Sequence, residues 1–124
     1  MDWKLSDDRP IFQQLYEQLS RRIVSGLYPP GERMPSVREL AGEAGVNPNT
    51  MQRALSQLES SGLAESNRTS GRTVTTDLER IQAVRRSLAQ EAAGRYLADM
   101  ETLGYDRAAA AELLRDEEEG GEET

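Results

Sequence analysis

Apolar residues recur at steps of three and four positions in several stretches of the chain, and this spacing predicts amphipathic helices. The first stretch follows a proline, and its apolar positions are Ile11, Phe12, Leu15, Tyr16, Leu19, Ile23 and Val24. Glycines and prolines within residues 26–31 end this predicted helix. Ahead of it, Trp3 and Leu5 alternate with polar residues, which predicts a short extended segment packed on the domain. We expect Asp7 or Asp8 to cap the helix.

Two shorter helices are predicted next, and both have strong start signals. Ser36 followed by Glu39 forms a capping box, in which each side chain satisfies a free amide at the helix start. Gly45 ends that helix, and Asn47-Pro48 then combines a favoured N-cap with a favoured first residue. The apolar stripes are Val37, Leu40, Ala41 and Ala44 on the earlier helix, and Met51, Ala54, Leu55 and Leu58 on the later one.

A β-hairpin is expected after Gly62, which ends the third helix. Residues 63–66 and 72–76 form two short segments around the polar, glycine-containing stretch 67–71. The second segment is β-branched except at its first residue, which favours a strand. The predicted hairpin therefore follows directly on the third helix.

Helical spacing returns at Asp77 and continues to about Leu103, where Gly104 breaks it. Asp106 is a candidate cap for a last short helix that contains Ala110, Leu113 and Leu114. The remaining stretch is acidic and glycine-containing, so we expect it to be disordered. The predicted domains are residues 1–76, a helical segment at 77–116 and an acidic tail at 117–124.

The order of these elements predicts a fold that is mainly α with a small β-hairpin. A short helix, a glycine turn and a capped second helix form a helix-turn-helix, and a hairpin directly after it is a wing. In such a domain the start of the second helix faces DNA. Its polar outward positions are Asn49, Thr50, Gln52 and Arg53. Asn and Gln side chains pair with adenine, and Arg pairs with guanine.

The composition excludes several classes of function. The chain of 124 residues has neither cysteine nor histidine, so disulfides, common zinc sites and imidazole-based catalysis are excluded. It also offers no nucleophile–base pair or phosphate-binding loop, so we expect neither an enzyme nor a cofactor. No run approaches the ~20 apolar residues that span a bilayer. The polar, acidic start does not resemble a signal peptide, and a reducing cytoplasm is the expected compartment.

The net charge of −7 initially argues against a nucleic-acid partner, but the charge is segregated. Residues 1–76 contain nine basic and nine acidic residues, whereas residues 77–124 contain six and thirteen. The whole acidic excess therefore lies in the C-terminal third. The first part remains free to carry a basic face.

The stretch from Gly26 to Ala41, which reads GLYPPGERMPSVRELA, resembles the signature of GntR-family winged-helix regulators. The resemblance continues through GVNPNT at 45–50 and spans roughly residues 5–76. The PIFQQ opening and the VNPNT turn look most like the YtrA subfamily. The resemblance implies a sequence-specific regulator, here a repressor, that binds double-stranded DNA.

The resemblance also implies roles for individual residues. Arg38 matches an arginine that contacts a base, Arg33 and Ser36 match positions near phosphates, and Gly71 matches the wing glycine. In the wing, Thr69 and Thr73 replace the glycine and the aromatic residue that are usual in the family. The full set of expected DNA-binding residues is Arg33, Ser36, Arg38, Asn47, Asn49, Thr50, Gln52, Arg53, Arg68, Gly71 and Arg72.

Only 48 residues follow the wing, which is too few for the ligand-binding domain of most GntR proteins. A small-molecule effector is therefore not indicated. In YtrA-like members a short two-helix segment forms a dimer, and a homodimer on a palindromic, inverted-repeat operator is expected here. The expected dimerisation residues are Leu78, Ile81, Leu88, Ala92, Tyr96, Leu97 and Met100.

Simpler interpretations remain open for several of these residues. Ser36 and Asn47 are helix caps first, Arg38 has an alternative role in a structural ion pair, and Arg53 is equally compatible with a solvated helix position. The arginines of the hairpin, Arg68 and Arg72, also fit ordinary surface charges. The alternative function is a winged-helix module for protein–protein contact without specific DNA binding.

Overall fold

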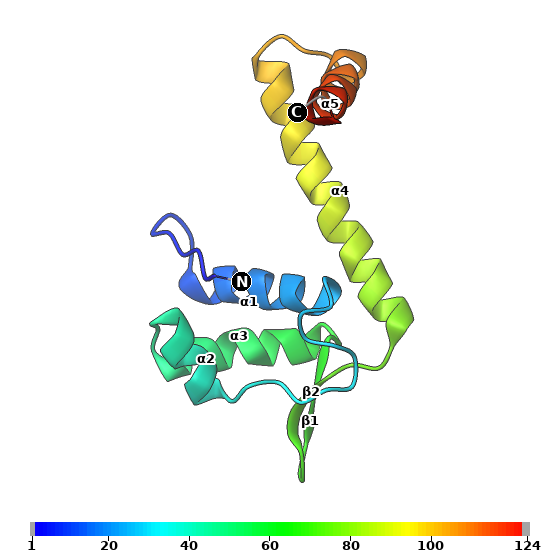
Figure 1. Cartoon of the computed structure of the whole chain (residues 1–124). Coiled ribbons are helices and arrows are strands. Elements are labelled where there is room, and N and C mark those ends of the chain that lie inside the picture. Colours follow the sequence, from blue (N-terminus) through cyan, green and yellow to red (C-terminus); the bar gives the residue numbers. More distant parts are fainter. Residues whose placement is uncertain (1, 123–124) are drawn as a thin grey trace. The chain divides into compact units, whose positions relative to one another are not determined.

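The computed structural model describes residues 2–122 and contains five helices and one antiparallel hairpin (Figure 1). The elements are α1 (Ile11–Val24), α2 (Val37–Ala44), α3 (Pro48–Ser60), β1 (Ala64–Asn67), β2 (Gly71–Val74), α4 (Leu78–Thr102) and α5 (Arg107–Glu122). The mainly helical class with a small hairpin is thus confirmed. The chain forms two compact units, Met1–Arg85 and Arg86–Thr124, called here the winged-helix unit and the C-terminal unit.

The core of the winged-helix unit is formed by α1, α2 and α3, and α1 and α2 both contact α3. The predicted stripes are confirmed, because their central positions are buried. The buried apolar residues of the three helices are Leu15, Leu19, Ile23, Leu40, Ala41, Met51, Ala54, Leu55 and Leu58. Each fully buried leucine or isoleucine contributes about 1.5–3 kcal/mol to folding. This helical core holds α2 and α3 in a fixed relative position.

The starts of α2 and α3 have the predicted caps. The Ser36 hydroxyl accepts the Glu39 amide at 3.1 Å, and the Glu39 carboxylate accepts the Ser36 amide at 3.3 Å. Gly45 ends α2 with φ +69°, a conformation that glycine adopts without strain. The side chain of Asn47 accepts the Asn49 amide at 2.7 Å, and Pro48 follows at the first helical position.

The hairpin pairs Ala64 with Val74 and Asn67 with Gly71. A preceding loop runs along the outer edge of β2, where the amides of Gly31 and Met34 donate to the carbonyls of Val74 and Arg72. The Val74 amide returns a bond to the Glu32 carbonyl, and Arg33 forms a bridge with Thr73. These bonds connect the loop before α2 to the hairpin after α3, so both flank the helix-turn-helix.

Residues 2–9, called here the N-terminal strap, lie along α1 and confirm the prediction that Trp3 and Leu5 pack on the core. Gln14 accepts the Ser6 amide and donates to the Ser6 and Arg9 carbonyls, each at 2.8 Å. Gln18 forms the same reciprocal pair with the Lys4 backbone. Gln14 and Gln18 lie one helical turn apart. Each accepts a backbone N–H of the strap and donates to a backbone carbonyl, as a neighbouring β-strand would.

The prediction that Asp7 or Asp8 caps α1 is wrong. Pro10 occupies the N-cap position, and no side chain bonds there. Asp8 instead accepts a hydrogen bond from the Ser6 hydroxyl within the strap. The path of the strap is determined by Gln14 and Gln18, so the aspartates are drawn away from the helix start.

The C-terminal unit contains the later part of α4 and α5, which are joined at a turn. Gly104 ends α4, and Asp106 caps α5 by accepting the Ala109 amide at 2.8 Å, as predicted. Met100 and Ala110 are its buried apolar residues among those that the structure describes. The Tyr96 hydroxyl donates to the Ala110 carbonyl at 2.8 Å and fastens the two helices.

The structure differs from the predicted organisation at two places. Ile81 and Val84, in the first turns of α4, pack on the winged-helix core, so that unit extends to Arg85 rather than to residue 76. α5 continues through residues 117–122, where the sequence predicted a disordered tail. Glutamate has a high helix propensity, and the alanines before this stretch favour the same helix. Residues 123–124 lie outside the described residues.

Candidate nucleic-acid interface

The N-terminal ends of α2 and α3 carry most of the predicted DNA-binding side chains. Arg38, in the first turn of α2, is exposed, and its side chain forms no ion pair with the described side chains of residues 2–118. On α3, Asn49 and Gln52 are exposed and Thr50 is half-buried. Amides at the start of a helix favour anions such as phosphate. At the start of α3 the amides of Asn49 and Thr50 already bond to Asn47. The Gln52 side chain donates to the Ser56 hydroxyl at 3.2 Å. The two helix starts therefore present the exposed side chains of Arg38, Asn49 and Gln52.

Arg53 is exposed on α3, and its side chain lies over an aromatic ring of another helix. The guanidinium carbon is 3.7 Å from the centroid of the Phe12 ring, in the first turn of α1. Stacking of this kind uses the face of the guanidinium and leaves its N–H edge available. Sequence reasoning placed Phe12 in the α1 stripe and missed this contact, because it joins two helices far apart in sequence.

Arg33 and Gly71 come together at the wing, although they belong to separate segments. Arg33 is exposed, and its Nε atom would lie 3.7 Å from a Cβ atom built at Gly71. Gly71 has φ +74°, so a side chain there is strained whatever the space. Arg68 is exposed in the turn between the strands. Two exposed arginines, Arg33 and Arg68, therefore lie near the tip of the wing, where the Gly71 backbone carries no side chain.

Arg72 differs from the other predicted DNA-binding arginines because it forms an ion pair with a carboxylate of the protein. Its Nε atom donates to the Glu59 carboxylate at 2.7 Å, and the Ser66 hydroxyl donates to the same oxygen at 2.6 Å. The side chains of Arg72 and Glu59 are only 14% and 29% exposed. The interpretation as an ordinary surface charge is thus wrong for Arg72. Glu59 fastens the end of α3 to both strands of the wing.

The environment of Glu59 changes its acidity. Partial burial raises the pKa of this carboxyl. The hydrogen bonds from Ser66 and Arg72 and the charge of Arg72 lower the pKa, and together they outweigh the effect of burial. The net result is a pKa below the ordinary value. Glu59 therefore stays ionised, and the contact between α3 and the wing persists at neutral pH.

The predicted dimerisation residues occupy three kinds of environment. Ile81 and Met100 are buried within the chain, the former against the winged-helix core. Leu88, Tyr96 and Leu97 are half-buried, while Leu78 and Ala92 are exposed. Sequence reasoning missed a further exposed apolar group on the C-terminal unit, namely Leu103, Tyr105, Leu113 and Leu114. Helical spacing identified the apolar positions, but it does not distinguish burial within the chain from exposure.

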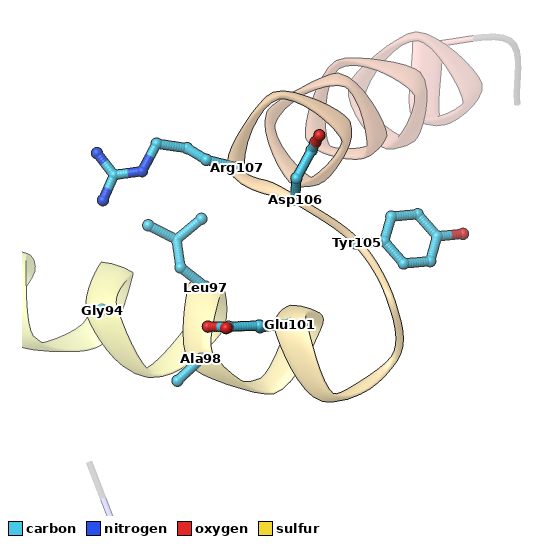
Figure 2. A pocket seen from close by; sticks show the side chains of 7 residues that line it. All are labelled: Gly94, Leu97, Ala98, Glu101, Tyr105, Asp106 and Arg107. Carbon is cyan, nitrogen blue, oxygen red and sulfur yellow. The ribbon is translucent and has the colours of Figure 1, made fainter.

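An open depression of about 480 Å³ lies in the C-terminal unit, where α4 turns into α5 (Figure 2). Its lining residues are Gly94, Leu97, Ala98, Glu101, Tyr105, Asp106 and Arg107. Leu97 and Arg107 face each other across it (Figure 2). The lining mixes an apolar floor with both signs of charge, which does not define one class of ligand.

Two features of the described part of the chain bear on other functions. No helix there is long and apolar enough to cross a membrane. No group of three or more acidic residues is placed to hold a metal ion within the same part.

Comparison with known proteins agrees with this geometry. Residues 11–74 match the family of bacterial regulatory proteins called the gntR family. YhcF of Bacillus subtilis, an uncharacterised HTH-type transcriptional regulator, is 32% identical over 98% of this chain and all of its own length. The HTH-type transcriptional repressor YtrA of the same organism is 40% identical over 50% of this chain and 48% of its own.

Solved structures show the same arrangement. A GntR-family transcriptional regulator from Listeria monocytogenes superposes with a TM-score of 0.82 at 30% identity, covering 90% of this chain and 98% of its own. The AraR DNA-binding domain, solved in complex with operator ORX1, superposes with a TM-score of 0.52 at 30% identity, covering 60% and 92%. The chain therefore belongs to the GntR family of transcriptional regulators, in its YtrA subfamily, and its winged-helix unit is a DNA-binding domain of that family.

Proposed function

We propose that the chain is a sequence-specific repressor that binds an inverted-repeat operator as a homodimer. The observation that carries this proposal is the pair of capped helix starts, where Arg38, Asn49 and Gln52 are exposed. Arg38 forms no ion pair with the described side chains, and the Gln52 side chain bonds only to its exposed neighbour Ser56 among them. An arginine forms paired hydrogen bonds with guanine, and Asn and Gln do so with adenine. Arg33, Arg68 and the Gly71 backbone are available to the sugar–phosphate backbone beside them.

The homodimer is supported by the incompleteness of the C-terminal unit. Leu103 is 70% exposed and Leu114 is 54% exposed, and each remains in contact with water in a single chain. Burial of two apolar residues in this helix pair offsets only a small part of the conformational entropy that is lost on folding. Association of two copies about a two-fold axis buries such groups and presents two α3 helices to DNA about one helical turn apart.

The repressor role is supported by a relative, the YtrA protein of B. subtilis, which bears that designation. A dimer held on an operator that overlaps a promoter excludes RNA polymerase by occupancy alone. No effector domain is needed for that step.

The test is a fluorescence-anisotropy titration of the full chain with DNA upstream of its own gene, at several salt concentrations. We expect saturable binding to one fragment, and a logarithm of affinity that falls linearly with the logarithm of salt concentration. Sedimentation should give one dimer per fragment. Absence of binding at low salt with every upstream fragment would reject DNA recognition and favour the alternative, a module for protein–protein contact.

A further inference from the structure

The stack between Phe12 and Arg53 joins the first turn of α1 to the exposed side of α3. The guanidinium carbon lies 3.7 Å from the ring centroid, which is close enough for direct stacking. Phe12 is half-buried, and the helix that carries it contacts α3. Arg53 is exposed, so the rest of its guanidinium faces solvent.

Among the side chains that the structure describes, residues 2–118, no carboxylate forms an ion pair with Arg53, whereas Arg72 is paired with Glu59. The short distance from the guanidinium carbon to the ring centroid suits a parallel stack. The N–H donors lie in the guanidinium plane, so such a stack leaves its edge free to bind an acceptor. Those donors match two neighbouring acceptor oxygens, or one oxygen and one ring nitrogen. A flexible side chain held in this way loses less conformational freedom when it binds such an acceptor.

We infer that Phe12 is a positioning residue for DNA recognition: it holds the Arg53 guanidinium so that its N–H edge meets an acceptor pair on the DNA. This inference rests on the proposed DNA-binding function of the α3 face. Phe12 itself does not touch the DNA, and its effect on affinity passes entirely through Arg53. The acceptor pair belongs either to a guanine edge or to a phosphate group, and the two sources differ in their dependence on sequence and salt.

The experiment is a double-mutant cycle on the full chain, using Phe12→Leu, Arg53→Ala and their combination, with operator affinity measured by fluorescence anisotropy. We expect Phe12→Leu to weaken binding about two- to five-fold, the usual value of an exposed cation–π contact. In the Arg53→Ala background the same change should have no further effect. Phe12→Tyr restores an aromatic face and should restore wild-type affinity. Equal losses in both backgrounds would overturn the positioning role.

The source of the acceptor is separated by two further measurements on Arg53→Ala. If a guanine supplies it, the loss disappears on one operator variant with that base pair changed. If a phosphate supplies it, the loss is uniform over operator variants and the salt slope falls by about one. Arg21→Ala, an exposed arginine on α1 away from the α2 and α3 starts, is the matched control and should bind as wild type.

The stack has a readout that requires no DNA. In the NMR spectrum of the free wild-type chain, the ring current of Phe12 should displace the Arg53 side-chain resonances, and Phe12→Leu should remove that displacement. Its absence in the wild type would overturn the inference even if the protein binds its operator. A displaced resonance in a protein that binds no DNA would instead reject the proposed function and, with it, any role for the stack in recognition.

Discussion

The winged-helix unit and the C-terminal unit are stabilised by different means. In the former, fully buried side chains from three helices form the core, and hydrogen bonds from Ser36, Asn47, Gln14 and Gln18 secure the helix ends and the strap. In the latter, two helices share the buried residues Met100 and Ala110, together with the bond from Tyr96. Both units expose some large apolar side chains, but the former has a large buried core beside its exposed Leu27 and Leu78. Among the described residues of the latter, the exposed apolar side chains are Leu103, Tyr105, Leu113 and Leu114, against the two buried residues.

This difference separates two tasks along one chain. Side chains that recognise DNA require fixed positions, and they belong to the unit with the large buried core. Surfaces that bind a second copy of the chain are expected where apolar side chains stay exposed in a single chain. Stability, assembly and DNA affinity should therefore respond to different substitutions.

The largest effect is expected from Leu58→Ala, because Leu58 is fully buried in the winged-helix core. Removing its side chain should lower the free energy of unfolding by about 2–5 kcal/mol, measured by urea denaturation. Leu27→Ala, at an exposed position of the same unit and outside the proposed interface, is the matched control and should change stability by less than about 0.5 kcal/mol. Similar losses for both variants would show that the buried core does not dominate the stability of this unit.

A smaller effect, on assembly, is expected from Leu114→Asp in α5. A charge placed where a leucine becomes buried should weaken the dimer by about 1.5–3 kcal/mol, measured by sedimentation velocity over a range of concentrations. Leu27→Asp adds the same charge to an exposed leucine of the winged-helix unit. It should leave the dimer intact. A Leu114→Asp protein that sediments as the wild type would remove α5 from the interface.

Arg38→Ala should act on DNA affinity and leave assembly unchanged. Loss of a base contact should weaken operator binding by about 1–3 kcal/mol, measured by anisotropy at fixed salt concentration. Arg21→Ala controls for the loss of one positive charge. Unchanged operator affinity for the Arg38 variant would exclude this residue from base recognition.

The smallest effect is expected from Glu59→Gln and depends on pH. The folded pKa of Glu59 is lowered, so its charge stabilises the fold above the unfolded pKa, and this contribution disappears as the pH falls through the folded value. The wild type should therefore be more stable than the variant by less than about 1 kcal/mol at pH 7. This difference should shrink as the pH falls below the unfolded pKa of glutamate, and it should vanish only below the lowered folded pKa. Thermal unfolding over a series of pH values from neutral to acidic measures it. A difference that does not depend on pH would show that the charge of Glu59 is not involved.

Local signals in the sequence predicted much of the fold. Ser36 with Glu39, Gly45, and Asn47 with Pro48 each act within one helical turn, so the ends of α2 and α3 follow from neighbouring residues. The contacts of Glu59 with Arg72 and of Phe12 with Arg53 do not, because they depend on how separate elements pack. Helical spacing likewise predicted Ile81 and Met100 to be apolar contact positions, and their partners inside the chain became clear only from the fold.

Trp3 is the single tryptophan of the chain, and its surroundings make it an intrinsic optical probe. Its ring lies 4.0 Å from the Arg22 guanidinium carbon, and its indole N–H is buried with no hydrogen-bond acceptor among residues 2–122. An indole shielded from water emits at shorter wavelength than one in water. While the core remains folded, the emission maximum of the unlabelled protein therefore reports whether the strap is docked on α1.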